Sequence, residues 1–434
     1  MNEVKSSYKE LSPFSIRIII YFLFFLSGLA GLIYEILWSK QFVPVFGNSA
    51  YAISIVLTAF MTGLGIGSLW FGRYADRHRD RLLLYSILEG GIALSAFLVP
   101  FFLQLLKKIM PLFFSSISES LPLISFIRFI FSFTILFIPC FLMGGTLPVL
   151  SKYCTEELKF VGHRISLLYG LNTFGAAARC FLTGFFLIET IGLSGTNNLA
   201  ISTNLTIGLT VIFIRFLHRK NKGKKFISKK DFSRKAVKLN KKEALIKIPE
   251  LSSKRNSILI VAFITGLTSL SLEVLWTRYL SFRIPSNAYS FSSILGVFLI
   301  GLGIGSLIYR LFLASYKNQI LILSIILFIS GSLILIMLSL ASELVFSRGL
   351  NFFPFIPVNL STPLGQKFQS INFALMTILI PTILMGITFP SLCKIFTQKL
   401  ETIGESIGKV YAINTAGAIT GSLLPVFLLS LIHI

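Results

Sequence analysis

Cysteine and acidic residues are scarce in this chain. The four cysteines, Cys140, Cys154, Cys180 and Cys393, form no CxxC pair and lie at no spacing typical of a Cys/His metal site. Neither a disulfide framework nor a zinc site is therefore indicated. The 17 Asp and Glu residues form no acidic cluster, and we expect no metal ion or other cofactor.

Charged residues of either sign are also few, at 13% of the chain against 54% hydrophobic residues, and the mean hydropathy of +0.81 excludes an ordinary soluble domain. A run of about 20 apolar residues crosses the hydrocarbon core as a helix, because no water is present there to bond the backbone. Eleven such runs lie near 16–38, 50–72, 82–106, 124–151, 166–189, 197–217, 258–279, 288–312, 319–341, 370–393 and 407–431. The sequence predicts an all-α, polytopic membrane protein.

The chain contains an internal duplication. Residues 26–67 recur at 264–305 with an offset of 238, and residues 142–175 recur at 384–417 with an offset of 242. Two copies of so long a unit indicate two lobes rather than a solenoid. The expected parts are an N-terminal six-span lobe over 16–217, a basic connector over 218–257 and a C-terminal five-span lobe over 258–434.

Because six spans is an even number, the second lobe should insert with the polarity of the first. The lobes would then be related by an axis along the membrane normal, as in the parallel repeats of major facilitator transporters. The repeat matches Ile434 with Gly192, the loop after the fifth span. We therefore expect a second lobe truncated by one span, through gene decay, a frameshift or the choice of the expressed segment, rather than an eleven-span design.

The net charge of +23 is unevenly distributed. Of the 40 Lys and Arg, 15 lie in 219–255, and the N-terminal flank and the loops after even-numbered spans hold 30 in all, against eight after odd-numbered spans. Lys and Arg in short loops stay in the cytoplasm, so we expect a multi-pass protein of the inner (cytoplasmic) cell membrane with its N-terminus in the cytoplasm. The 219–255 segment should attract anionic headgroups of the lipid bilayer, at roughly 1 kcal/mol per nearby charge. Nucleic acid is not expected as a partner, because stacking aromatics are scarce there.

An ordered series of motifs carries a family resemblance. The motifs are Ser27-Gly-x-x-x-Leu-x-Tyr-Glu-x-Leu-Trp38, Phe46-Gly-x-Ser-x-Tyr-Ala52, Phe60-Met-x-Gly-Leu-x-x-Gly-Ser68, Leu142-Met-Gly-x-Thr-Leu-Pro148 and Tyr169-x-x-Asn-Thr-x-Gly-Ala176. They resemble the membrane domain of fused spermidine synthase-like proteins, in which a major facilitator-like helical domain is joined to a cytoplasmic aminopropyltransferase-like Rossmann domain. The resemblance implies a facilitator-like fold and an aminopropyltransferase-like domain or partner.

The catalytic half of such proteins is not found in this sequence. An aminopropyltransferase needs a glycine-rich turn between a strand and a helix, and acidic residues that hold a polyamine. The glycine pairs Gly90-Gly91 and Gly144-Gly145 lie within apolar spans with no strand pattern before them. We therefore expect that this chain is not an enzyme.

A weaker resemblance concerns the loop Gly72–Arg81, after the second predicted span. It resembles the Gly-x-x-x-Asp-Arg-x-Gly-Arg-Arg loop of the facilitator superfamily, although the motif's second Gly and the Arg after it are replaced. In that superfamily the Asp caps a helix N-terminus and pairs with Arg to lock one access state. The candidate gating residues are Gly72, Arg73, Asp76 and Arg77. The alternative is a cluster of cytoplasmic positive charge without a gating role.

Ionisable groups at membrane depth are costly and indicate functional sites. Glu35 and Glu273 occupy matching places in the first and seventh predicted spans. In a facilitator-like fold these helices line the central cavity, so the two carboxylates could bind a cationic ligand or relay protons. The alternative is that each carboxylate bonds a neighbouring helix end or an interfacial Trp of its own lobe.

Three further features lie inside predicted spans. Glu89 is about 10 Å inside the third span by helix rise and has no acidic counterpart in the second lobe, so it is a further substrate or proton candidate. Asn172 and its match Asn414 could bond across helices or contact a ligand. The glycine triplets in 63–67 and 301–305 let helices approach a neighbour closely.

Three functional hypotheses follow. The first is facilitator-like transport or sensing of a small, cationic solute such as a polyamine. The second is a membrane anchor or scaffold for a spermidine synthase-like enzyme, without transport. The third is a truncated fragment without function.

Arg179 lies near the middle of the fifth span, where the second lobe has Gly421. An unpaired Arg at that depth costs about 3 kcal/mol or more, so Arg179 either forms an intramembrane ion pair with Glu89 or Glu35 or is a lesion. The substitution Arg179→Gly distinguishes these hypotheses when membrane insertion and protein abundance are measured. Both should fall if Arg179 has an acidic partner, and both should rise if it is a lesion.

Overall fold

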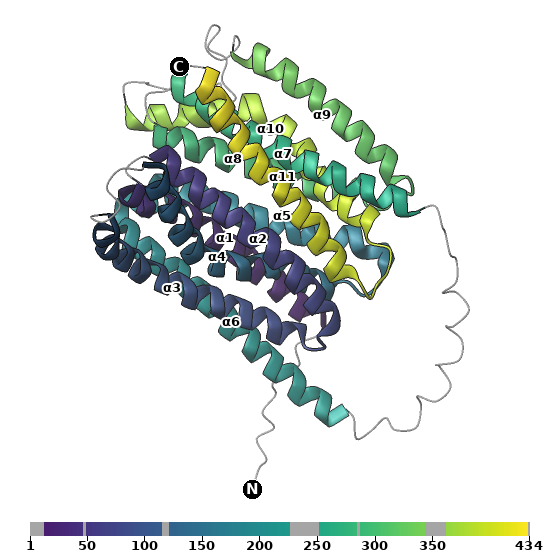
Figure 1. The fold of residues 1–434 in the computed structure, drawn as a ribbon. Coiled ribbons are helices and arrows are strands. Elements are labelled where there is room, and N and C mark those ends of the chain that lie inside the picture. Colours follow the sequence, from purple (N-terminus) through teal and green to yellow (C-terminus); the bar gives the residue numbers. More distant parts are fainter. Residues whose placement is uncertain are drawn as a thin grey trace.

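The structure is a computed structural model that describes residues 13–46, 49–114, 121–225, 251–283, 287–342 and 362–432. The described residues form helices joined by short connections, as the sequence predicts (Figure 1). The α-helices are α1 (Pro13–Phe46), α2 (Ser49–Arg77), α3 (Arg81–Phe114), α4 (Leu121–Cys154), α5 (Val161–Leu182), α6 (Ile188–Lys225), α7 (Leu251–Arg283), α8 (Asn287–Ile308), α9 (Gln319–Ser342), α10 (Pro363–Phe396) and α11 (Ile403–Ile432). Three shorter elements are the 3-10 helix η1 (Leu158–Phe160) and the π-helices η2 (Thr183–Leu187) and η3 (Tyr309–Leu313).

Among the described residues, nine helices are long and apolar enough to cross a membrane. This composition is that of an integral, multi-pass membrane protein. The sequence predicts two more spans, within α2 and α11, and both form helices that fall outside these nine. The two helices pack against each other through small and polar residues, as where the buried Ser68 hydroxyl donates to the carbonyl oxygen of Gly408 over 3.1 Å. Small and polar residues at such a contact let two helices approach each other closely.

The boundary between the fifth and sixth predicted spans differs from the observed one. The prediction extends the fifth span to residue 189, whereas α5 ends at Leu182 and the π-helix η2 leads directly into α6. The break lies inside α6, at Gly192, where φ is 67° and ψ is −177°. Only glycine adopts such a conformation readily, because a Cβ atom would clash with the backbone. One glycine therefore supplies the break that hydropathy assigns to a loop.

The basic connector predicted over 218–257 is partly helical at both ends. Helix α6 continues to Lys225, and α7 begins at Leu251. Residues 226–250, which hold much of the basic segment, lie outside the described residues. Its contact with anionic headgroups therefore stays a prediction.

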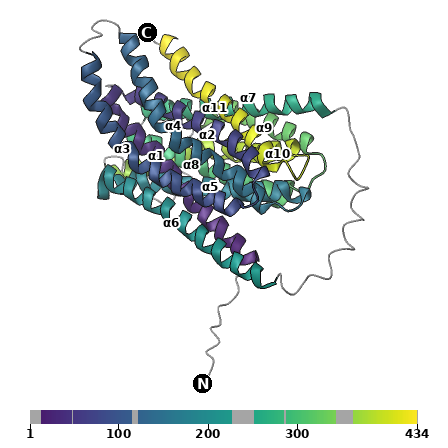
Figure 2. The ribbon, with the colours of Figure 1, turned by 60° about the horizontal axis from the view of Figure 1, so that its bottom comes forward.

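The helix contacts of the first half of the chain recur in the second half, shifted by six helices. In the first half α1 packs on α5, α2 on α4 and α3 on α4, and in the second half α7 packs on α11, α8 on α10 and α9 on α10. Across the halves, α2 contacts α11 and α5 contacts α8, which are again matching pairs. Figure 1 shows α3 and α6 on one outer side of the bundle and α9 on the other, and Figure 2 gives a second view. The sequence repeat therefore corresponds to a repeat in packing.

Glycines bring the matching helix pairs together. A Cβ atom on Gly28 of α1 would meet the carbonyl oxygen of Asn172 in α5, and one on Gly266 of α7 would meet the carbonyl oxygen of Asn414 in α11. Likewise, a Cβ atom on Gly67 of α2 would meet the carbonyl oxygen of Phe141 in α4, and one on Gly305 of α8 would meet the carbonyl oxygen of Ile383 in α10. In each pair the side chain of alanine would already be too large, so the backbones can touch only at glycine.

We expect Gly67→Ala and Gly305→Ala to lower the apparent melting temperature of the purified protein in detergent, because the added methyl group forces two backbones apart. Overpacking of this kind costs about 1–3 kcal/mol. The control is Gly31→Ala, because a Cβ atom at Gly31 meets no atom within 4 Å. Equal melting temperatures for the three variants would contradict the proposed role of these contacts.

Candidate functional site

A cavity of about 280 Å³ lies between the two halves of the chain. Its polar wall residues include Ser27, Asn172 and Asn204 from the first half and Glu273, Tyr411 and Asn414 from the second. Much of the remaining wall consists of Leu, Phe, Met and Gly side chains. A mostly apolar cavity with a few convergent polar groups is the usual form of a small-molecule site.

Glu273 of α7 lies on the cavity wall, and Glu35 of α1 lies close enough for the two carboxylates to repel each other electrostatically. Both side chains are partly exposed. Neither carboxylate accepts a side-chain hydrogen bond from another described residue. The indole N–H of Trp38 has no partner among the described residues either, so the alternative in which Trp38 bonds Glu35 is not realised.

Asn172 and Asn414 each form a hydrogen bond to a neighbouring helix and also lie on the cavity wall. The amide of Asn172 donates to the carbonyl oxygen of Phe24 over 3.4 Å, and that of Asn414 donates to the carbonyl oxygen of Ala262 over 3.0 Å. Phe24 and Ala262 are matching positions of the repeat. The amides therefore join α1 to α5 and α7 to α11 in the same way, with both side chains also bordering the cavity.

Glu89 of α3 is fully buried beside this cavity. Its Oε1 accepts a hydrogen bond from the Ser27 hydroxyl over 2.7 Å, and its Oε2 accepts one from the Asn204 amide over 2.6 Å. The amide oxygen of Asn204 accepts in turn from the Tyr34 hydroxyl over 3.0 Å. Ser27, Asn204, Tyr34 and Glu89 are called the Glu89 network below.

Arg179 forms no ion pair with a carboxylate among the described residues, so the predicted pair with Glu89 or Glu35 is not observed. Its Nε donates to the Thr183 hydroxyl over 3.3 Å, and its Nη2 has no described partner, although the side chain is buried. Tyr34 interacts electrostatically with both Arg179 and Glu89. Tyr34 of the Glu89 network thus interacts with both charged side chains, although the two do not pair with each other.

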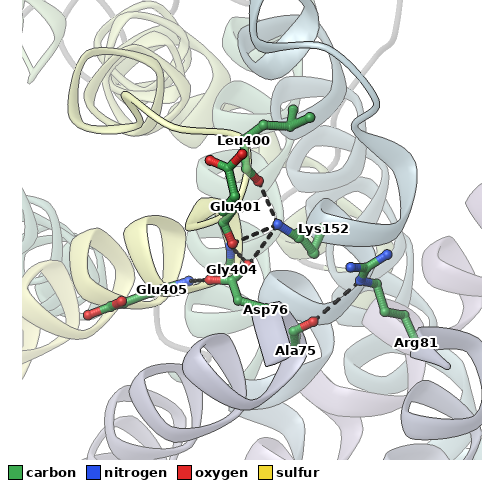
Figure 3. A network of polar contacts seen from close by, with 8 residues as sticks. All are labelled: Ala75, Asp76, Arg81, Lys152, Leu400, Glu401, Gly404 and Glu405. Carbon is green, nitrogen blue, oxygen red and sulfur yellow. Dashed lines mark hydrogen bonds and ion pairs between the residues drawn. The ribbon is translucent and has the colours of Figure 1, made fainter. Parts of the chain in front are cut away.

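A second polar cluster joins the end of α2 to the start of α11 (Figure 3). Asp76 accepts hydrogen bonds from the backbone N–H groups of Gly404 over 3.0 Å and Glu405 over 2.8 Å. A carboxylate is stabilised at this place by the unpaired N–H groups and the dipole of the helix. Asp76 also pairs with Lys152 of α4 at 3.1 Å, and both side chains are about nine-tenths buried. We call Asp76, Lys152 and the first turn of α11 the Asp76 latch.

Lys152 is the member of the latch that the loop motif does not predict. Its ammonium group donates to the carbonyl oxygens of Leu400 at 2.5 Å and Glu401 at 2.8 Å, in the connection before α11. The motif predicts an Asp–Arg pair, but Arg77 is exposed and has no recorded contact with a described residue. Successive residues of a helix point about 100° apart, so Arg77 cannot share the partners of Asp76. The sequence did carry a signal, because Lys152 recurs as Lys394 at the second offset.

The other two candidate gating residues also lie at this interface. A Cβ atom on Gly72 would meet the carbonyl oxygen of Gly404, so glycine allows α2 to touch α11 there. Arg73 pairs with Glu405 at 3.5 Å, and its side chain is 58% exposed, so this pair adds little to stability. Lys409 pairs with Glu405 at 2.7 Å, and its hydrogen bond lowers the pKa of the Glu405 carboxyl group.

The matching contact between α5 and α8 has no acidic residue in the position of Asp76. Ala314 occupies that position, and Lys394 donates to its carbonyl oxygen over 2.6 Å. The Ser306 hydroxyl donates to the carbonyl oxygen of Ser166 over 2.6 Å, which repeats the contact of Ser68 with α11. Within the described residues, the contact between α5 and α8 therefore has no counterpart of the Asp76 latch.

No family model and no curated protein matches this chain. Its function is therefore inferred from the cavity, the Glu89 network and the Asp76 latch.

We expect Asp76→Ala to loosen the contact between α2 and α11, because α11 loses its N-terminal cap and Lys152 its counter-charge. Loss of a cap alone costs about 1 kcal/mol. The measurement is the rate at which a hydrophilic maleimide labels a cysteine placed at the buried Ser68, which should rise. The four native cysteines are buried and give little background. Arg77→Ala is the control, and an equal rise in that variant would refute the role of Asp76.

Proposed function

We propose that this chain is a two-lobed, major facilitator-like membrane protein that transports a small cationic solute through the central cavity. The observation that carries the proposal is the cavity between the halves with Glu273 on its wall and Glu35 near it. The repeated helix pairs support two lobes related by an axis along the membrane normal. In such an arrangement the solute site lies where the lobes meet.

A cationic solute fits the charge of the cavity. Glu35 and Glu273 carry like charges near each other, and neither has a hydrogen-bond donor or an ion-pair partner among the described residues. A bound cation would relieve the repulsion and supply the counter-charge that both carboxylates lack. The resemblance to spermidine synthase-like membrane domains makes a polyamine the first solute to test.

The Asp76 latch would act as the gate at one end of the cavity. The positive-inside distribution of Lys and Arg predicts that this end faces the cytoplasm. With α2 held on α11 at this end, the solute would have no path to the cytoplasm. Transport then requires that the latch opens while the solute is bound, as alternating access demands.

We expect Glu273→Gln and Glu35→Gln to reduce spermidine uptake into proteoliposomes by at least about tenfold, equivalent to about 1.4 kcal/mol of binding energy. Each substitution removes a charge and keeps the shape of the side chain. The matched control is Glu189→Gln, an exposed acid at the start of α6, which should leave uptake unchanged.

A stable, folded protein that neither binds nor transports spermidine would argue against the proposal. That outcome would favour the alternative hypothesis of a membrane anchor for a spermidine synthase-like partner. Flux that persists in the Glu273→Gln and Glu35→Gln variants would instead keep transport and remove these two residues from the site.

A further inference from the structure

The Glu89 network lies apart from the pair formed by Glu35 and Glu273, and transport of a cation alone does not require it. Glu89 is fully buried, and no cationic side chain of the described residues pairs with it. An ionised carboxylate at membrane depth is costly without a cationic partner. The matching position of the second half is Leu327, so the packing of the repeat does not depend on an acid there.

We propose that Glu89 binds one proton through Ser27, and that this proton competes with a cation bound in the central cavity. The inference rests on the proposed function for its cation, but the proton site itself depends only on the Glu89 network. The proposal identifies the coupling ion as a proton and assigns one exchangeable proton to Glu89.

The Ser27 side chain can form a hydrogen bond with Glu89 whether Glu89 is ionised or protonated. When Glu89 is ionised, the Ser27 hydroxyl donates to its Oε1 over 2.7 Å. When a hydronium ion in the cavity gives a proton to Oε1, a water molecule is left and the new carboxyl O–H can donate to Ser27 Oγ. The Ser27 hydroxyl then turns to a carbonyl oxygen of its own helix, a bond that serine in helices commonly makes. Neither state leaves Glu89 Oε1 or the Ser27 hydroxyl without a hydrogen-bond partner.

Ser27 and Asn204 also connect Glu89 to the solute site. Both residues line the cavity with Glu273, and both bond the Glu89 carboxylate directly. A cation in the cavity is therefore one residue away from this charge, in surroundings that screen it weakly. Protonation of Glu89 removes a negative charge and weakens cation binding, and by linkage a bound cation expels the proton.

The other titratable groups around Glu89 do not supply the proton. Tyr85 on the same helix interacts electrostatically with Glu89 and with Cys154 of α4, and Tyr34 of α1 interacts with Glu89 and with Arg179 of α5. Tyrosine and cysteine stay neutral, and arginine stays charged, over the range in which a carboxyl group titrates. Glu89 is thus the one member of this cluster whose charge changes there.

Infrared spectroscopy tests the proton site without any solute. The difference between spectra of the purified protein at acidic and neutral pH should contain a carbonyl band of a protonated carboxylic acid that Glu89→Gln removes. Ser27→Ala should keep that band at a shifted frequency, because the carboxyl group loses a hydrogen-bond partner. Glu273→Gln is the matched control, which should leave the Glu89 band in place.

Spermidine binding then tests the competition. Addition of spermidine in a weakly buffered solution should release about one more proton per chain from wild type than from the Glu89→Gln variant, and the affinity should rise up to about tenfold per pH unit while Glu89 titrates. The Glu89→Gln variant should bind spermidine without that additional proton and without that part of the pH dependence. Its melting temperature and elution volume show whether it is folded, and Ser27→Ala provides the second test if it is not.

The outcomes separate the two proposals. A carbonyl band that is missing, or that survives Glu89→Gln, overturns the proton site. Spermidine binding with the same proton release in wild type and Glu89→Gln also overturns it and leaves the proposed transport intact. A wild-type protein that shows the Glu89 band without binding spermidine supports the proton site and counts against the proposed function.

Discussion

The close approach of helix backbones at glycine is the constraint on which the architecture depends. Gly28 and Gly266 bring α1 onto α5 and α7 onto α11, and other glycines do the same for α2 with α4 and α8 with α10. In lipid, helices gain little from burying apolar surface, so backbone contact and dispersion between well-packed atoms must hold them together. Without these glycines the cavity between the halves would have a different shape, because its wall consists of the same helices.

Several polar side chains both join helices and line the cavity. Asn172 and Asn414 use their amide nitrogens to join helices and still border the cavity. Ser27 has the same double position, because it bonds Glu89 and lines the wall. Any movement that changes how α1 packs on α3 and α6 must therefore also change the polar surface that a solute meets.

Much of the fold could be predicted from the sequence, because hydropathy and the internal repeat depend only on residues near one another in the chain. The apolar runs gave the positions of the helices, and the loop motif indicated Asp76 as a residue of interest. Three features could not be predicted in this way. They are the pairing of Asp76 with Lys152, the hydrogen bonds of Glu89 with Ser27 and Asn204, and the lack of an acidic partner for Arg179 among the described residues. Each depends on which residues meet across helices, and no pattern within one helix specifies that. The break at Gly192 falls in the loop predicted between the fifth and sixth spans, but the helical turns directly before and after it were not predicted, since hydropathy does not record backbone conformation.

The two halves meet at two contact surfaces, α2 with α11 and α5 with α8, which are called seams here. The two seams occupy matching places in the repeat but differ chemically. The seam of α2 with α11 contains charged pairs, one of them largely exposed, whereas the seam of α5 with α8 relies on hydroxyl and ammonium groups that donate to carbonyl oxygens. Dissolved salt screens an exposed pair of opposite charges more than it weakens a short hydrogen bond to a carbonyl oxygen. Ionic strength should therefore act mainly on the exposed pair of Arg73 with Glu405, which has no counterpart between α5 and α8 among the described residues.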